Sequence, residues 1–452
     1  MTLLDETVHE QEGRASTARA GEAARAYGFH TRAVHAGARP DAATGARAVP
    51  IYQTTSYVFE DTAEAAALYG LQQYGHIYSR ITNPTTAAFE ERIAALEGGV
   101  GAIATASGHA AQFLVLTTLL QPGDHIVSSR TLYGGTYTQL DVTLRQWGID
   151  TVFVDVSDPE NVRRAITPRT RAIYAETIGN PRLDVLDIGA VAAVAAEAGL
   201  PLIIDNTFAT PALCRPIAHG ATIVVESATK YIGGHGTSIG GVIVDAGDFD
   251  WDNGRFARMT DPSAAYHGIR FHETFGQFAF LMKARTEGLR DQGATLSPFN
   301  AFLFLQGLET LALRMERHSR SALEVAAFLE RHPAVGWVSY PGLASSPSYH
   351  LAQQYLPRGC GGILAFGVRG GLAAGRAFIE NLSLLSHLAN VGDTKSLVIH
   401  PASTTHQQLS SAQRADAGVG DDLIRLSIGL EDVEDIIWDL DCALTVARRV
   451  AG

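Results

Sequence analysis

Cysteine is scarce in this sequence, and so are the features that direct a chain into a membrane or out of the cell. Three cysteines occur among 452 residues, at Cys214, Cys360 and Cys442, and they form no CxxC pair. Three scattered thiols argue against a disulfide framework and favour a reducing compartment, so we expect a cytoplasmic protein. No apolar run approaches the roughly 20 residues that cross a bilayer. The first 30 residues lack the apolar stretch of a signal peptide and are expected to form a flexible extension.

The sequence also lacks the charge and the motifs of several binding classes. Its formal net charge is −12, which disfavours nucleic acid or an anionic membrane as the main partner. The stretch GGHGTSIGG does not fit GxGxxG, and no GxxxxGK[ST] occurs, so a nucleotide-binding protein is the weaker alternative from another class. There are 16 histidines, but no HExxH or similar spacing, and we predict no metal site.

What the sequence does contain, from residue 83 onward, is an alternation of helix and strand patterns. NPTTAAFEERIAALEGG predicts a helix with Asn83 as its N-cap, Pro84 at its first position and Gly98 as its stop. Helical patterns separate the apolar runs GAIATAS, HIVSS, TVFVDV, RAIYAET, PLIIDNTF and ATIVVESATK. Short apolar strands joined by helices indicate an α/β fold with a mostly parallel sheet covered on both faces.

After about residue 295 the pattern changes. SPFNAFLFLQGLETLALRMERHSRSALEVAAFLERH predicts one or two long helices, and GGILAFGVRGG and LIRLSIG predict strands. We therefore expect four parts: an extension (1–30), an N-terminal arm (31–82), a large domain (83–294) and a smaller C-terminal α+β domain (295–452).

Polar residues with distinct chemistry stand where the predicted strands end, which is where parallel sheets bind ligands. Lys230 follows one strand, and a buried lysine loses charge and can form a Schiff base. Ser227 and Thr229 offer two hydroxyl donors, and the strand-to-helix turn at Gly108 offers backbone N–H groups to an anion. Asp205 ends another strand and needs a cationic partner, which a protonated pyridine nitrogen would supply. Together these residues predict a pyridoxal phosphate site.

Long motifs then establish a family resemblance. They are IYSRITNPTT, LYGGTY, AETIGNP, IIDNTFATP, ESATKYIGGHGTSIGG and VIHPASTTH, and the similarity runs from about TRAVHAG (residue 31) to LIRLSIGLEDVEDII (residue 437). On these motifs the chain resembles the Cys/Met-metabolism family of pyridoxal-phosphate enzymes, which implies the aminotransferase-like fold, fold type I. Within that family LSPFNAFLFLQGLETLALRMERH and SHLANVGDTKSLVIHPASTTH are most similar to the O-acetylhomoserine sulfhydrylase branch.

The resemblance implies a role for each matching residue around the cofactor. Lys230 would link to it covalently and carry protons, Asp205 would pair with its ring nitrogen, and Tyr133 would stack on the ring and assist proton transfer. The phosphate would be held by Gly108, His109, Ser227 and Thr229, and that of a neighbouring subunit by Tyr78 and Arg80. Relatives often carry an apolar residue in place of His109, so its backbone N–H is the part expected to bind, and the effect of its side chain stays open.

The resemblance also implies how the substrate binds and how the chains assemble. Asn180 and Arg425 would hold the substrate carboxylate, the latter through a bidentate contact. Because the arm would complete a neighbour's site, the minimal active unit is a dimer, and a tetramer built from dimers is expected.

The implied reaction is γ-replacement, in which sulfide or methanethiol displaces acetate to give homocysteine or methionine. The alternatives within the family are a cystathionine γ-synthase and a methionine or cystathionine γ-lyase. Lys395 occupies a position where many cystathionine-handling relatives carry glutamate, and a lysine would repel the distal ammonium of cystathionine or cysteine. Lys395 therefore favours a small thiol. The sequence leaves open acetyl against succinyl as leaving group, and sulfide against methanethiol.

Overall fold

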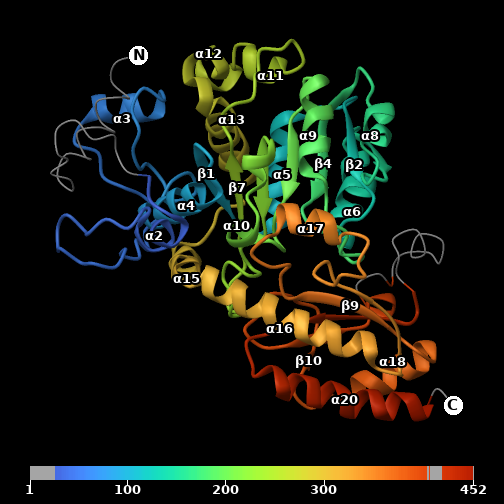
Figure 1. Cartoon of the computed structure of the whole chain (residues 1–452). Helices are drawn as coiled ribbons and strands as arrows, with labels where there is room; N and C mark the ends of the chain where they lie inside the picture. Colours follow the sequence, from blue (N-terminus) through green and yellow to red (C-terminus); the bar gives the residue numbers. More distant parts are fainter. Residues whose placement is uncertain (1–25, 405–406, 408–419, 451–452) are drawn as a thin grey trace.

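The computed structural model describes residues 26–404, 407 and 420–450, and the figures follow these limits. Most of the predicted extension lies outside the described residues. Helix α2 (Phe29–His35) already begins inside its last two positions. Figure 1 shows a large sheet with helices around it and, below it, a second sheet flanked by the helices of the C-terminal part.

The large sheet has seven strands in the order β1-β7-β6-β5-β4-β2-β3. Strand β7 runs antiparallel to both of its neighbours, and the other neighbouring pairs are parallel. The sequence prediction of a mostly parallel sheet is therefore confirmed. The strands are β1 Gly101–Thr105, β2 His125–Ser129, β3 Asp150–Val154, β4 Thr170–Glu176, β5 Leu202–Asp205, β6 Ile223–Glu226 and β7 Gly241–Asp245.

Helices cover both faces of this sheet. Successive residues of each strand point to opposite sides, so each strand contributes side chains to two apolar cores. In β5, Leu202 and Ile204 pack into one apolar core together with residues of α4, α8 and α9. Ile203, between them, packs into a second core with residues of α5 and α13. These helices are α4 Pro84–Glu97, α5 Gly108–Leu119, α8 Pro159–Ala165, α9 Ile188–Glu197 and α13 Ala279–Lys283.

Helix α4 forms as its sequence predicts. The Asn83 side chain accepts hydrogen bonds from the N–H groups of Thr85 and Thr86, Pro84 is the first helical residue, and Gly98 ends the helix at φ 88°. The stretch GTYTQLDVTLRQWG, predicted as one helix, instead contains a π-helical turn, η1 (Gln139–Thr143), between α6 (Gly134–Thr138) and α7 (Leu144–Gln146).

The second sheet has five strands in the order β10-β11-β12-β9-β8 and is built from the C-terminal part. The predicted strands are confirmed as β9 (Ile363–Val368) and β12 (Leu423–Ser427), and the predicted long helical stretch divides at Thr310 into α15 and α16. Strands β8, β10 and β11 had no clear sequence signal. The bounds are α15 Pro298–Glu309, α16 Leu311–Arg331, β8 Val335–Ser339, α17 Tyr349–Tyr355, α18 Gly371–Glu380, β10 Ser386–His387, β11 Leu397–Ile399 and α20 Val433–Val450.

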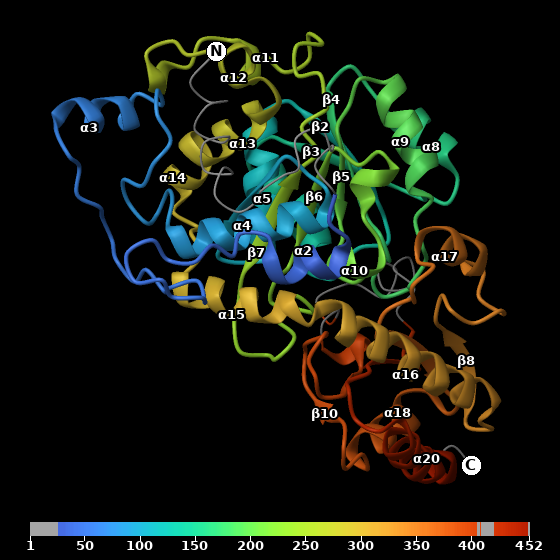
Figure 2. The same cartoon turned by 60° about the vertical axis from the view of Figure 1, so that its left-hand side comes forward.

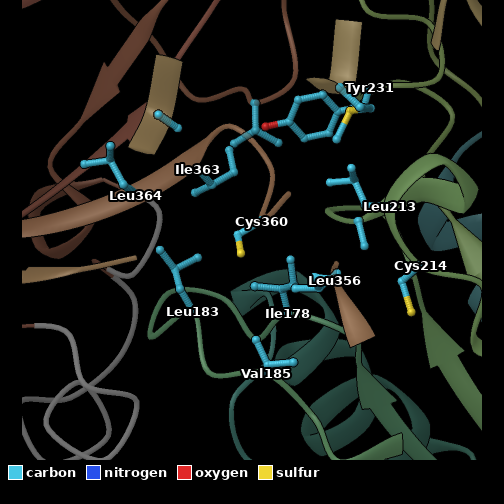
Figure 3. Packing of buried hydrophobic residues seen from close by; sticks show 14 of the residues in the cluster. Ile178, Leu183, Val185, Leu213, Cys214, Tyr231, Leu356, Cys360, Ile363 and Leu364 are labelled. Atoms are coloured by element: carbon cyan, nitrogen blue, oxygen red, sulfur yellow. The ribbon is translucent and has the colours of Figure 1, made fainter. Parts of the chain in front are cut away.

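An apolar seam joins the two sheets. Figure 3 shows Ile178, Leu183 and Val185 packed beside Leu356, with Cys360, Ile363 and Leu364 above them and Leu213 to the right. Tyr231, which directly follows Lys230, is fully buried in the same cluster. The seam thus fixes the backbone beside Lys230 against the second sheet.

The N-terminal arm extends away from this core. Helix α3 (Thr62–Tyr69) lies at the outer edge of the molecule in both whole-chain views (Figure 2). Of the helices in the described ranges, none is both long and apolar enough to span a bilayer. The remaining short helices are α10 Thr210–Leu213, η2 Pro216–His219, α11 Ala257–Thr260, η3 Ala264–Tyr266, α12 Phe271–Phe275, η4 Gly276–Phe278, η5 Ala284–Leu289, α14 Arg290–Gln292 and η6 Pro401–Ser403.

Candidate active site

The carboxyl ends of five large-sheet strands meet along one edge, and most of the predicted site residues stand there. Strands β1, β2, β4, β5 and β6 all run in the same direction. The turn to α5 follows β1, Tyr133 follows β2, Asn180 follows β4, Asp205 ends β5, and Lys230 follows β6. The topology therefore gathers residues that lie far apart in the chain.

The start of α5 provides the predicted anion site. The Ser107 side chain caps the helix by accepting a hydrogen bond from the N–H of Ala110 at 3.1 Å. The preceding N–H groups, of Gly108 and His109, belong to the first turn, where a helix has no internal acceptors for them. A Cβ on Gly108 would lie 2.8 Å from the Cβ of Ser227, so only glycine lets the helix start approach that hydroxyl residue. Gly108 and Ser227 thus lie together as a phosphate cradle requires.

Thr229 has an additional structural role. Its hydroxyl donates to the carbonyl of Gly240 at 3.1 Å and accepts from the N–H of the same residue at 3.0 Å. This pairing ties the loop after β6 to the loop before β7. A phosphate contact by Thr229 stays a prediction, and it would require the hydroxyl to release the Gly240 carbonyl.

Lys230 is partly buried and has no carboxylate partner among the described residues. Its Nζ donates to Oδ1 of Asn390 at 2.7 Å. Burial and, secondarily, the charge of Arg425 lower the pKa of Lys230 to about 8. A substantial fraction of the amine is therefore neutral near physiological pH, as a nucleophile or base requires. Sequence reasoning missed Asn390, which lies 160 residues away in the loop between β10 and β11.

Asp205 is a carboxylate that lacks a cation. Its Oδ1 accepts a hydrogen bond from the N–H of Thr207 at 2.9 Å, and burial raises its pKa. In the part of the chain that the structure describes, no basic side chain forms an ion pair with it. A protonated ring nitrogen would supply the missing charge. With the α5 cradle and the lowered pKa of Lys230, this carboxylate makes the residues present fit pyridoxal phosphate.

Arg425 and Asn180 form a pair that bridges the two sheets. Arg425 lies on β12, is 5% exposed, and donates through Nη1 to Oδ1 of Asn180 at 3.3 Å. Burial lowers the pKa of Arg425 to about 10, and no carboxylate within the described ranges pairs with it. An unpaired buried guanidinium is costly, and a carboxylate ligand would offset that cost.

Two predicted aromatic groups lie beside the cradle. Tyr133 is 45% exposed, and its ring lies 5.6 Å from the His109 ring, centroid to centroid. Burial, and then the charge of Lys230, lower the pKa of His109, so its imidazole is neutral at physiological pH. The exposed Tyr133 ring leaves a face open for stacking.

The arm residues and Lys395 are exposed in the single chain. Arg80 lies over the Tyr78 ring at 5.6 Å and donates to the carbonyl of Arg290 at 2.6 Å. Lys395 has a side chain that is 72% exposed, and its Nζ is 3.7 Å from Oδ1 of Asp393. In the described residues, no hydrogen bond or ion pair joins these three side chains to Lys230, and their roles stay predictions.

Comparison with known proteins agrees with this geometry. Residues 30–445 match the family model described as Cys/Met metabolism PLP-dependent enzyme. The chain is 55% identical to the O-acetyl-L-homoserine sulfhydrylase of Leptospira meyeri, over 92% of this chain and 96% of that protein. It is 54% identical to the homocysteine synthase of Schizosaccharomyces pombe, over 93% and 98% of the two chains.

A solved structure shows the same fold. It is a Campylobacter jejuni protein provisionally named O-acetylhomoserine (thiol)-lyase, and it carries a pyridoxyl-lysine-5′-monophosphate residue. It is 39% identical to this chain, with a TM-score of 0.90 over 93% of this chain and all of that one. The predicted fold type I is therefore confirmed. The chain belongs to the Cys/Met metabolism family of enzymes and depends on pyridoxal phosphate.

Proposed function

We propose that this enzyme is an O-acetylhomoserine sulfhydrylase. In the overall reaction, hydrosulfide adds to Cγ of O-acetylhomoserine and acetate leaves, which gives homocysteine. The enzyme is then a transferase of an aminocarboxypropyl group, and methanethiol in place of sulfide gives methionine. Two of the relatives described above carry the names O-acetyl-L-homoserine sulfhydrylase and homocysteine synthase, and this supports both the acetyl group and sulfide.

The observation that carries the proposal is the pair of Arg425 and Asn180 close to Lys230. The guanidinium lacks a carboxylate, and its charge acts on the Lys230 amine. An α-amino acid bound through its carboxylate at this pair would place its Cα toward Lys230. The arrangement suits a reaction that begins at Cα of an amino acid.

The protein's own residues divide the remaining work. When bound, pyridoxal phosphate supplies the electron sink that stabilises negative charge at the substrate carbons. Lys230, with its pKa lowered to about 8, moves protons at Cα and Cβ, and Asn390 orients its Nζ. Asp205 would hold a proton on the ring nitrogen of the bound cofactor, and Tyr133 would pack over that ring.

We assign the choice of co-substrate to Lys395. Its ammonium stands on a side chain that is 72% exposed and would repel the distal ammonium of cysteine or cystathionine. This supports a small thiol over a cystathionine γ-synthase or γ-lyase activity. Incubation with cystathionine alone tests the assignment, because rapid cleavage would identify a lyase.

We further propose that the enzyme is a homotetramer built from dimers, with each site shared between two chains. The support is the exposed arm, in which Val58 is fully exposed and Tyr78 is 41% exposed. Mixing inactive Lys230→Ala and Arg80→Ala proteins tests the sharing, since hybrid dimers contain one site with both native residues. Recovered activity is expected, and no recovery would contradict a shared site. The unpaired cysteines support a cytoplasmic location, which cell fractionation would test.

Product analysis tests the proposed function itself. The enzyme is incubated with O-acetylhomoserine or O-succinylhomoserine, each with sulfide, methanethiol or cysteine. We expect homocysteine and acetate from O-acetylhomoserine and sulfide as the fastest reaction. Faster formation of cystathionine from O-succinylhomoserine and cysteine would overturn the assignment.

A further inference from the structure

Glu176 is a buried carboxylate beside the site that none of the roles above uses. It is the last residue of β4, and its Cα pairs with that of Asp205 on β5. Paired residues of neighbouring strands point to the same face, so the two carboxylates lie on one side of the sheet. Glu176 is 9% exposed, and no basic side chain in the described ranges forms an ion pair with it.

Its two oxygens hold two different loops. Oε1 accepts the N–H of Tyr133 at 2.7 Å, and Oε2 accepts the N–H of Asn180 at 3.1 Å. Tyr133 follows β2 and Asn180 follows β4, so one side chain fixes the backbone of both. These are the residues expected to contact the cofactor ring and the substrate carboxylate.

The contacts continue into the second sheet. Asn180, held through its N–H, accepts from Arg425 through its side-chain oxygen at 3.3 Å. Tyr133 precedes α6 and makes no side-chain cap hydrogen bond there; its carbonyl accepts the N–H of Tyr137, and its own N–H is held by Glu176. The position of Glu176 is therefore transmitted to Arg425, two hydrogen bonds away.

The charge of Glu176 is linked to that of Asp205. Burial and, next, Asp205 raise the pKa of Glu176 well above its usual range, while the N–H bonds of Tyr133 and Asn180 act to lower it. A carboxylate with both oxygens accepting N–H groups is the geometry of the charged form. A cation facing Asp205, as proposed for the protonated ring nitrogen, would reduce the repulsion between the two acids and favour that form.

We propose that Glu176 is a positioning residue, charged in the holoenzyme, that sets Tyr133 against the cofactor ring and Asn180 against the substrate carboxylate. It acts through these residues and touches neither the substrate nor the reacting atoms. The inference rests on the proposed function, because that function assigns the roles of Tyr133 and Asn180.

The main test is Glu176→Gln in the holoenzyme. The side chain keeps its size, but its amide nitrogen cannot accept an N–H, so one of the two loops loses its anchor. We expect kcat/KM for O-acetylhomoserine to fall about 10- to 100-fold, with a raised KM. We also expect the pH midpoint of the bound cofactor's absorbance to move to lower pH, because a negative charge near the ring is removed.

Asp245→Asn is the matched control. Asp245 is also a buried carboxylate at the end of a strand, and burial raises its pKa to about 7. Because β7 is antiparallel, Asp245 pairs with Gly101 and Ile223, the first residues of their strands, and stands at the opposite edge of the sheet. This variant is expected to keep the wild-type KM and absorbance midpoint, whatever it does to stability.

Glu176→Asp separates position from charge. It keeps the carboxylate but shortens the side chain by one methylene, so it should raise KM while leaving the absorbance midpoint near that of the wild type. If the glutamine variant does not fold, the KM of the aspartate variant alone tests the proposal. Wild-type KM values in the folded variants, with loss of stability alone, would overturn the proposal.

A failure of the proposed function can be told apart from a failure of this inference. If the wild type does not react with O-acetylhomoserine and sulfide, two readouts remain: the dissociation constant of pyridoxal phosphate from the apoprotein, and the spectral titration of the holoenzyme with L-methionine. About tenfold weaker L-methionine binding in Glu176→Gln is expected. Unchanged affinity for both would contradict the positioning role.

Discussion

Two regions of the molecule bury positive charge, and they treat it in opposite ways. Around α13, the Nζ of Lys283 lies 2.6 Å from Glu287 and 4.6 Å from the Phe271 ring centroid, and Arg285 lies 2.8 Å from Glu90. At the carboxyl edge of the large sheet, Lys230 has no carboxylate partner in the described ranges, and neither has Arg425, which reaches Asn180 at that edge from β12. Burial is common to both regions, and only the partners differ.

The pKa values follow the partners. Burial acts to lower the pKa of Arg285, but Glu90 outweighs it and the net shift is upward. Burial lowers the pKa of Arg425 to about 10 and that of Lys230 to about 8. The paired region is a completed structural contact, whereas the unpaired one is arranged for ligands that bring the missing charge.

Arg314 refines this distinction. It is buried with no carboxylate partner in the part of the chain that the structure describes, and burial lowers its pKa to about 10 as well. Its guanidinium, however, donates to the carbonyls of Tyr231, Ile232 and Gly307. Among the described residues, Arg425 has a single long hydrogen bond, to Asn180. Unused hydrogen-bonding capacity, more than the absence of an acid, marks the functional cation.

The largest expected effect separates the two buried lysines. Lys230→Ala should lower kcat by roughly a thousandfold or more, because no other group can supply its amine. Lys283→Met should keep the wild-type kcat and lose about 1.5–3 kcal/mol of unfolding free energy, because Glu287 loses its charged partner. Steady-state assays and urea denaturation of both variants measure this, and an active Lys230→Ala protein would refute the comparison.

The two arginines give the next effect. Arg425→Met should lower kcat/KM by about 10- to 150-fold, mainly through KM, because the substrate carboxylate loses a charged hydrogen-bond donor. Arg285→Met should leave KM unchanged and cost about 3–5 kcal/mol of stability, since it leaves Glu90 buried and unpaired. Measurement of KM and of the urea midpoint shows whether each arginine serves substrate binding or stability. A loss of stability with an unchanged KM in Arg425→Met would count against a binding role.

A smaller effect is expected at Asn390. Asn390→Ala removes the acceptor of the Lys230 Nζ hydrogen bond, so kcat should fall about 3- to 12-fold while KM stays near the wild-type value. Asn300→Ala is a suitable control, because Asn300 is half-buried and its side-chain amide donates to the carbonyl of Ile239. A raised KM with unchanged kcat would place Asn390 in substrate binding instead.

The smallest effect is a shift in pH dependence. The apoprotein captures pyridoxal phosphate through the neutral amine of Lys230, so the rate should rise with pH through a midpoint near 8. The positive charge of Arg425 favours the neutral amine, and Arg425→Met should therefore move the midpoint to higher pH. Stopped-flow absorbance over pH 6–10 measures the rate, and a downward shift would contradict the coupling.

Sequence reasoning located Asp205 and Lys230 because each breaks an apolar run at a strand end, a local pattern. It missed Glu176 and Asn390 because their roles depend on contacts across 43 and 160 residues. Glu176 is 43 residues from Tyr133, and nothing in RAIYAET indicates which loop it faces. Strand β10 has only two residues, too few for a periodic signal, and the π-helical turn η1 lies within an ordinary helical pattern.

Borohydride reduction of the holoenzyme, followed by peptide mass spectrometry, tests the central claim most directly. The chain contains three lysines, and their surroundings differ: Lys230 is partly buried without an acid, Lys283 is buried with one, and Lys395 is exposed. Reduction makes the link between cofactor and lysine permanent. We predict a pyridoxyl group on the peptide that contains Lys230 alone. A pyridoxyl group on Lys283 or Lys395 in place of Lys230 would contradict the account.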